Sequence, residues 1–350
     1  MSQQQVRAGN PGRTLGLYFF SALQKESDDA AAYGLMLDAA QSADAGGLDF
    51  VWVPERHFTP FGGGHPNPAV LAAAIAVVTN RVRIRAGSVV LPLHDPLRVA
   101  EEWAVVDNLS YGRAEISSAT GWSPRDFVLA PDAYEVRAAR ADENFGIVQQ
   151  LWNGGEVSRE GPDGTEYRVR TYPRPVQPVL PRWITASGNP ATFRRAGEVG
   201  AGLLSSYGLF PPEELAERID LYRRTFAERQ GGPGRVCLMV HAAIAESGAE
   251  IRRLAQDPLR RYLSAYLAQQ DAATDPAVAK RRLDIAVHRY LHGRSLIGDS
   301  AEAVEVLTGI FETGADEVAC LVDFGLPRES VLGTVAELAA LRAKFSSDSV

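Results

Sequence analysis

Short apolar runs alternate with longer segments of helical periodicity along most of the 350-residue chain. The apolar runs have the length of strands and are rich in branched and aromatic residues, which is typical of strands buried on both faces. We predict strands over residues 15–20, 50–53, 82–90, 113–119, 182–186, 201–205, 236–244 and 316–322.

The segments between these runs carry apolar residues at helical spacing and have helix start and stop signals. The first of them follows Asp28 and Asp29 and ends at Gly46 and Gly47. We predict helices over residues 30–47, 66–79, 94–110, 138–152, 190–199, 212–229, 300–313 and 328–344.

A strand–helix alternation of this kind implies parallel strands joined by right-handed crossovers. About eight units favour an α/β fold closed into a (β/α)8 TIM barrel. An open doubly wound sheet is the competing geometry. No GxGxxG motif follows the first strand, which disfavours the dinucleotide-binding form of that alternative.

We expect a single barrel domain over residues 14–345, between a flexible leader (1–13) and a flexible tail (346–350). Two regions interrupt the alternation. Residues 153–181 are rich in glycine and proline and predict a small hairpin with an extended arm. Residues 257–296 predict extra helices. Long insertions in a barrel usually shape its active face.

Composition narrows the classes of partner. The formal net charge is −7 and no long basic run is present, so neither nucleic acid nor an anionic membrane surface is expected as a partner. No segment reaches the roughly 18 apolar residues of a membrane span. The start of the chain lacks the apolar core of an export signal. Two cysteines in apolar surroundings, Cys237 and Cys320, favour a reducing compartment, the cytoplasm.

The stretch PERHFTPFGGG places Glu55, Arg56 and His57 directly after the second strand and follows them with three glycines. In a barrel, catalytic residues lie at the carboxyl ends of strands. These three side chains are therefore our catalytic candidates. A salt-bridged loop with a capping histidine is the structural alternative.

Small polar residues follow several other strands. Gly87 and Ser88 lie within the third strand, where glycine can mark the close approach of a ligand. Further small residues follow the fourth strand (Ala119, Thr120, Gly121, Trp122) and the fifth (Ser187, Gly188, Asn189). Because such turns at helix N-termini bind anions, we predict a phosphate-bearing cofactor across the barrel mouth.

Several segments together resemble the bacterial luciferase-like flavin-dependent monooxygenases. The resemblance covers nearly the whole chain and depends on PERHFTPFGG, GSVVLPLHDPLRVAEE, LSYGR, IGD and TGAD, in that order. PNPAVL and ATGWSPRDFVLAP resemble the subgroup that acts in natural-product biosynthesis, beside polyketide and nonribosomal peptide assembly lines.

The resemblance implies reduced FMN and molecular oxygen as co-substrates, C4a-peroxyflavin chemistry, and a separate flavin reductase that supplies FMNH2. It also implies a non-prolyl cis peptide bond at Gly87–Ser88. The cofactor-binding residues carried over are Gly87, Ser88, Ala119, Thr120, Gly121, Trp122, Ser187, Gly188, Thr192, Ser205 and Tyr207. The substrate would be a natural-product intermediate, either a small molecule or bound to a carrier protein. Homodimers are common in the family, so a homodimer is expected.

Two residues depart from bacterial luciferase, which has histidine at the position of Arg56 and arginine at that of Thr120. Either Arg56 or His57 could then serve as the acid or base. An F420-dependent oxidoreductase on the same barrel is one alternative function, and a non-catalytic flavin-binding protein is another.

The other histidines have mainly structural interpretations. His94 precedes a proline turn, and His241 lies in an apolar strand, where it is a core residue or a substrate contact. His288 and His292 have the i, i+4 spacing of helical metal ligands but no accompanying ligand pattern, so no metal is expected.

Overall fold

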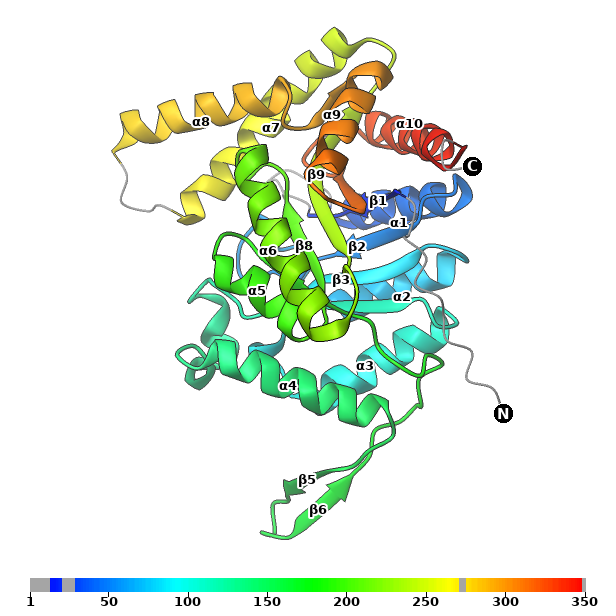
Figure 1. Ribbon diagram of the computed structural model, residues 1–350, viewed down its shortest axis with the longest axis vertical. Coiled ribbons are helices and arrows are strands. Elements are labelled where there is room, and N and C mark those ends of the chain that lie inside the picture. Colours follow the sequence, from blue (N-terminus) through cyan, green and yellow to red (C-terminus); the bar gives the residue numbers. More distant parts are fainter. Residues whose placement is uncertain (1–12, 21–28, 271–274, 348–350) are drawn as a thin grey trace.

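A computed structural model describes residues 13–20, 29–270 and 275–347 of the chain. Its strands close into a barrel in the order β1-β2-β3-β4-β7-β8-β9-β11, and every pair in the ring is parallel (Figure 1). The barrel strands are β1 (Thr14–Tyr18), β2 (Phe50–Val53), β3 (Arg83–Val90), β4 (Ala114–Ala119), β7 (Arg182–Thr185), β8 (Gly202–Ser206), β9 (Val236–Ile244) and β11 (Glu317–Leu321). The predicted (β/α)8 barrel is confirmed.

Helices cover the outside of this barrel. They are α1 (Asp29–Ala45), α2 (Pro68–Val78), α3 (Pro96–Leu109), α4 (Arg137–Trp152), α5 (Pro190–Glu198), α6 (Pro212–Gln230), α7 (Gly248–Gln270), α8 (Pro276–Leu291), α9 (Ser300–Glu312) and α10 (Arg328–Ser347). Side chains cap several of their first turns; Asn67 and Asp95, for example, accept backbone N–H bonds from α2 and α3. None of the helices described is both long and apolar enough to cross a membrane.

Two segments depart from the simple alternation. Residues 153–181 include an antiparallel hairpin, β5 (Val157–Glu160) and β6 (Glu166–Val169), which extends away from the barrel beyond α4 (Figure 1). Between β9 and β11 the chain adds α7, α8 and a short strand, β10 (Leu296–Gly298), which pairs with β9.

Some predicted boundaries differ from the observed ones. Helix α7 begins at Gly248, before the expected insertion of residues 257–296, and continues through Pro258, although proline usually interrupts a helix interior. Helix α10 continues to Ser347, into the expected tail. Of the expected leader only Arg13 is described, and its guanidinium lies 4.9 Å from the ring centre of Phe311. Residues 1–12 and 348–350 are outside the described part of the chain.

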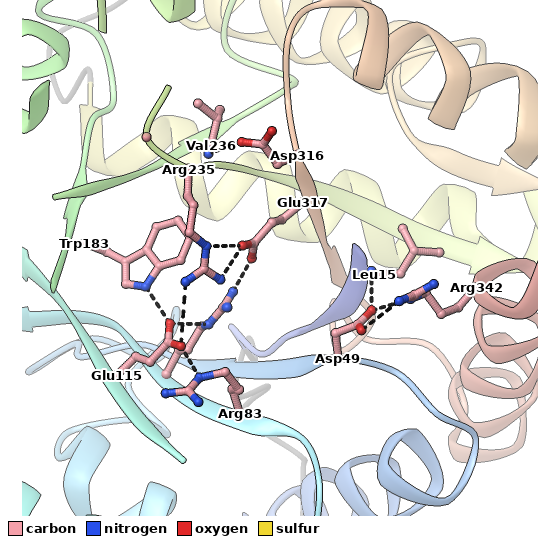
Figure 2. Close-up of polar contacts among 12 residues, drawn as sticks. Leu15, Asp49, Arg83, Glu115, Trp183, Arg235, Val236, Asp316, Glu317 and Arg342 are labelled. Carbon is pink, nitrogen blue, oxygen red and sulfur yellow. Dashed lines mark hydrogen bonds and ion pairs between the residues drawn. The ribbon is translucent and has the colours of Figure 1, made fainter. Parts of the chain in front are cut away.

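The amino-terminal half of the barrel interior is filled with charges. Glu115 on β4 and Glu317 on β11 are both 1% exposed, and guanidinium groups surround them. Figure 2 shows Arg83, Arg235 and the Trp183 indole N–H converging on the two carboxylates. Arg85, also 1% exposed, pairs with both: its Nε lies 2.8 Å from Glu115, and its Nη1 bonds to Glu317.

Aromatic rings enclose this network. The Arg85 guanidinium lies 4.2 Å from the ring centre of Phe50, 5.1 Å from Trp52 and 4.7 Å from Trp183. Burial alone would raise the pKa of Glu115, but the arginines outweigh it and lower the pKa to about 2. These buried charges in the amino-terminal half of the barrel, which we call the charged floor, are therefore stable only together.

Two free cysteines lie in adjacent barrel strands, Cys237 on β9 and Cys320 on β11. Both are completely buried, and burial raises the pKa of each thiol well above its ordinary range.

Replacing Arg85 by methionine should destabilise the fold by about 3 kcal/mol, because it leaves two buried carboxylates with one cation fewer. Urea unfolding at pH 7 measures the change. Arg98→Met is the matched control: this arginine is 69% exposed beside Glu102, so its loss should cost less than about 1 kcal/mol.

The difference in unfolding free energy between the unmodified chain and Arg85→Met should depend on pH. Glu115 has a pKa of about 2 in the fold against an ordinary 4.5, so its ionic contribution is complete above pH 4.5 and is lost as the pH falls towards 2. The stability gap between the chain and Arg85→Met should narrow across that window. A gap that stays constant would contradict the assignment of the destabilisation to this carboxylate.

Candidate active site

A cavity of about 300 Å³ opens at the carboxyl ends of the strands, above the charged floor. Its walls come from β1, β3, β4, β7, β8 and β9, from the loop after β2, and from α7 and α8. This is the face on which (β/α)8 enzymes carry their active sites, and the volume is at the lower end of the range for ligand pockets.

The cavity brings together most of the residues predicted from the sequence. Those on its wall are Glu55, Arg56, Gly87, Ser88, Ala119, Thr120, Gly121, Trp122, Ser187 and Ser205. Four predicted residues are not on the wall: His57, Gly188, Thr192 and Tyr207.

Glu55 is the centre of a buried hydrogen-bond network. Its Oε1 lies 2.8 Å from His57 Nε2 and 2.7 Å from His94 Nε2, while its Oε2 accepts the backbone N–H of Val90 at 2.8 Å. Burial would raise the pKa of Glu55, but the bonds from His57 and His94 lower it, and the bond to Glu55 in turn raises the pKa of His94. An ionised carboxylate only accepts hydrogen bonds, so each Nε2 donates one.

This network directs His57 away from the cavity, because its Nε2 is used by Glu55. The ligand atoms of Glu55, His57 and His94 lie within 4.8 Å of one another, which suits a metal site in principle. They are already occupied with each other, so their arrangement holds the loop after β2 against the end of β3.

Arg56 is the cationic side chain that reaches the cavity from this loop. Its Nη1 lies 3.5 Å from Asp126 Oδ2, its Nη2 donates to Gln269 Oε1 on α7, and its guanidinium lies 4.5 Å from the ring centre of Trp122. Its Nε is buried and has no hydrogen-bond partner among the described residues. Burial lowers the pKa of Arg56, and Asp126 opposes that effect, so the group remains a fixed cation.

The three glycines after this loop have a geometric role. Gly62 has a φ of +74°, and a Cβ on Gly63 would lie 1.9 Å from the carbonyl oxygen of Thr59. Backbone bonds close the turn, from Arg56 N to His65 O at 2.9 Å and from His65 N to Gly62 O at 3.1 Å. The glycines therefore permit a tight turn.

The peptide bond between Gly87 and Ser88 is cis, which confirms the expectation from the resemblance. The Tyr18 hydroxyl donates to the Gly87 carbonyl. On the other side, Ser88 Oγ lies 2.6 Å from Thr185 Oγ1, which lies 2.8 Å from Ser117 Oγ. Side chains from four strands thus fix this part of the wall.

The turn between β7 and α5 presents small polar groups at a helix N-terminus. Ser187 is exposed on the wall, and Asn189 caps α5 by accepting the N–H of Ala191 at 2.9 Å. Arg218 of α6 donates to the Gly188 carbonyl and supplies a cation behind the turn. Ser205 Oγ donates to Ala186 O at 2.8 Å, so it braces the turn from β8.

Several residues of the cavity were not predicted from the sequence: Tyr18, Asp126, Thr185, Tyr262, Tyr266, Gln269 and Tyr290. Tyr18 and Thr185 occupy inward positions at strand ends, which the period of two could have indicated. The α7 and α8 residues lie on a helical insertion whose docking the sequence pattern does not specify.

Comparison with known proteins agrees with this geometry. The family model described as luciferase-like monooxygenase matches residues 14–317. The chain belongs to this luciferase-like monooxygenase family.

Three curated proteins that are similar to this chain show the range of functions within the family. The chain is 25% identical to the oxygenase component of a flavin-dependent trigonelline monooxygenase from Acinetobacter baylyi, over 85% of each chain. It is 27% identical to 4-hydroxyprotoasukamycin monooxygenase from Streptomyces nodosus subsp. asukaensis, over 79% of this chain and 76% of that protein. It is 31% identical to an F420-dependent glucose-6-phosphate dehydrogenase from Kineococcus radiotolerans, over 59% of this chain and 60% of that one.

Among solved structures, the monooxygenase RslO1 from Streptomyces bottropensis superimposes with a TM-score of 0.79. The alignment covers 93% of this chain and 98% of that one at 24% identity, which supports the shared fold.

The residues of the cavity suit a cofactor that carries a planar ring system and a phosphate. The ring system requires a largely apolar wall, and Val90, Ala119 and Gly121 supply apolar groups beside the Gly87–Ser88 peptide. A phosphate requires donors, and the Ser187 hydroxyl on the cavity wall is one, with the Arg218 cation behind the turn. The buried, unpartnered Nε of Arg56 is a further donor close to the cavity.

Trp122 should report ligand binding. It is 51% exposed on the cavity wall, whereas Trp52, Trp103, Trp152 and Trp183 are at most 2% exposed. Titration with FMN should quench the tryptophan fluorescence, and Trp122→Phe should remove most of that change. Quenching of equal size in the variant would show that Trp122 is not the residue that reports binding.

Proposed function

We propose that the protein is an FMNH2- and O2-dependent monooxygenase that acts on a natural-product intermediate. The observation that supports this most directly is a buried cation, Arg56, on the wall of a cavity whose other residues suit a flavin. The monooxygenase relatives described above align over 79% and 85% of the chain, against 59% for the F420-dependent one.

Reduced FMN would supply the two electrons with which one atom of O2 enters the substrate and the other leaves as water. The chain's own residues provide the setting for that chemistry. Arg56, a fixed cation that is 6% exposed, would stabilise negative charge that develops on oxygen. Glu55, His57 and His94 hold the loop that carries Arg56, so we assign them as positioning residues.

The remaining partners follow from the same assignment. A separate reductase would supply FMNH2, since one relative is named as an oxygenase component. The substrate would be a small molecule or a carrier-bound chain, and exposed basic residues on α8 (Lys280, Arg281) could receive an acidic carrier. A homodimer is supported by exposed apolar side chains on the neighbouring helices α2 and α3: Val70, Val77, Val105 and Leu109.

An isotope experiment tests the reaction class. Product formed from candidate substrates with FMNH2 under 18O2 should carry one labelled oxygen atom, detected by mass spectrometry, and no product should form without O2. Replacing FMN by F420 should give no product. Oxygen-independent turnover with F420 would overturn the proposal in favour of a dehydrogenase, and FMN binding without turnover would favour a passive flavin-binding protein.

Arg56→Met should slow the reoxidation of enzyme-bound FMNH2 by O2 at least tenfold relative to the unmodified chain, because the negative charge that develops on oxygen loses its cation. Stopped-flow reoxidation at 450 nm and a peroxide assay measure this without a substrate. Arg56→Lys keeps a positive charge and should restore part of the reoxidation rate. The exposed Arg125→Met should behave as the unmodified chain.

His57→Phe tests the positioning role. Removing the His57 bond to Glu55 should loosen the Arg56 loop and slow reoxidation by O2 less than Arg56→Met does. It should leave FMN affinity within about threefold. A His57→Phe effect larger than that of Arg56→Met would instead make His57 the catalytic acid or base.

A further inference from the structure

The half of the cavity beneath α7 and α8 has a different chemistry from the half near α5. His241, on β9, lies on its wall and is 3% exposed. Its Nε2 is buried and has no hydrogen-bond partner among the residues described. A buried polar atom without a partner costs stability, so its persistence beside a cavity points to a ligand that supplies the missing bond.

Aromatic rings surround this imidazole. The ring centres of Tyr262, Tyr290 and Phe324 lie 4.8, 5.0 and 5.4 Å from that of His241, at interplanar angles of 79°, 84° and 62°. No carboxylate is paired with the ring among the described residues, and burial lowers its pKa to about 3. The imidazole is therefore neutral at physiological pH, with one donor and one acceptor nitrogen.

The same half of the cavity is walled by a connected aromatic cluster. Phe20 lies 5.1 Å from Phe61, which lies 4.8 Å from Tyr262 and 6.2 Å from Tyr266 between ring centres. All four line the cavity. Such rings favour a flat ligand with its own π system, which gains edge-to-face and offset contacts beyond simple burial of area.

We propose that this half of the cavity is a substrate subsite for a planar aromatic molecule bearing a hydroxyl group, which hydrogen-bonds to His241. The inference deepens the proposed monooxygenase function by naming the substrate class. A hydroxyl fits either tautomer of the imidazole, because it can donate to one nitrogen or accept from the other.

Binding of small probes to the full chain at pH 7 tests the subsite without flavin turnover. Equilibrium dialysis would compare 2-naphthol with naphthalene, which lacks the hydroxyl, and with decahydro-2-naphthol, which is saturated and not flat. The unmodified chain should bind 2-naphthol about tenfold more tightly than either. Equal affinity for naphthalene would show that the hydroxyl makes no favourable hydrogen bond, and equal affinity for the saturated alcohol would show that the subsite has no preference for aromatic rings. Either result overturns the proposal.

His241→Phe should abolish the preference for 2-naphthol over naphthalene, and the exposed His288→Phe on α8 is the matched control that should retain it. Should His241→Phe fail to fold by circular dichroism, His241→Leu tests the same loss. A retained preference in a folded His241 variant would overturn the role of this residue.

Saturating FMN should change the 2-naphthol affinity less than threefold, because the residues of the subsite are not among those assigned to the flavin. Displacement of 2-naphthol by FMN would overturn the proposal of a separate substrate subsite. Failure of FMN itself to bind would count against the proposed function and leave the comparison of the probes intact, so the two failures are distinguishable.

Discussion

Closure of the parallel sheet is the constraint on which the rest of the structure depends. Once the last barrel strand pairs with the first, every second side chain of each strand must fit inside the ring. At the amino-terminal end that space is filled by arginine, glutamate and tryptophan side chains. At the carboxyl end it is left open as a cavity. The packed floor therefore gives the site a rigid base.

The fold could be predicted from the sequence because strands and helices in a barrel have distinct periods and sharp boundaries. The apolar run FVWV indicates a buried strand, and the apolar residues at helical spacing in residues 66–79 indicate a helix, whatever surrounds them. The charged floor was not predicted. Arg85 and Glu115 look like ordinary polar residues of neighbouring strands, whereas two of their partners, Arg235 just before β9 and Glu317 on β11, lie far along the chain. Closure of the barrel brings these two partners to the pair.

The site shows the same division. Residues that follow strands directly, such as Arg56, Ser88 and Ser187, reach the cavity because the barrel fixes where a strand ends. Which neighbour of a pair faces inward depends on local bonds that the sequence does not display: Glu55 holds His57, and so Arg56 faces the cavity. The aromatic wall from α7 and α8 could not be placed, since the pattern of an inserted helix gives its apolar face but not its docking position.

The two cysteines offer a way to follow the barrel itself. Cys237 and Cys320 lie in the paired strands β9 and β11, completely buried and with their thiols protonated. A thiol-specific reagent can reach either cysteine only when the structure around it opens. The rate at which label accumulates on an intact sample would thus measure these openings, and ligands that slow it would be those that keep the barrel closed.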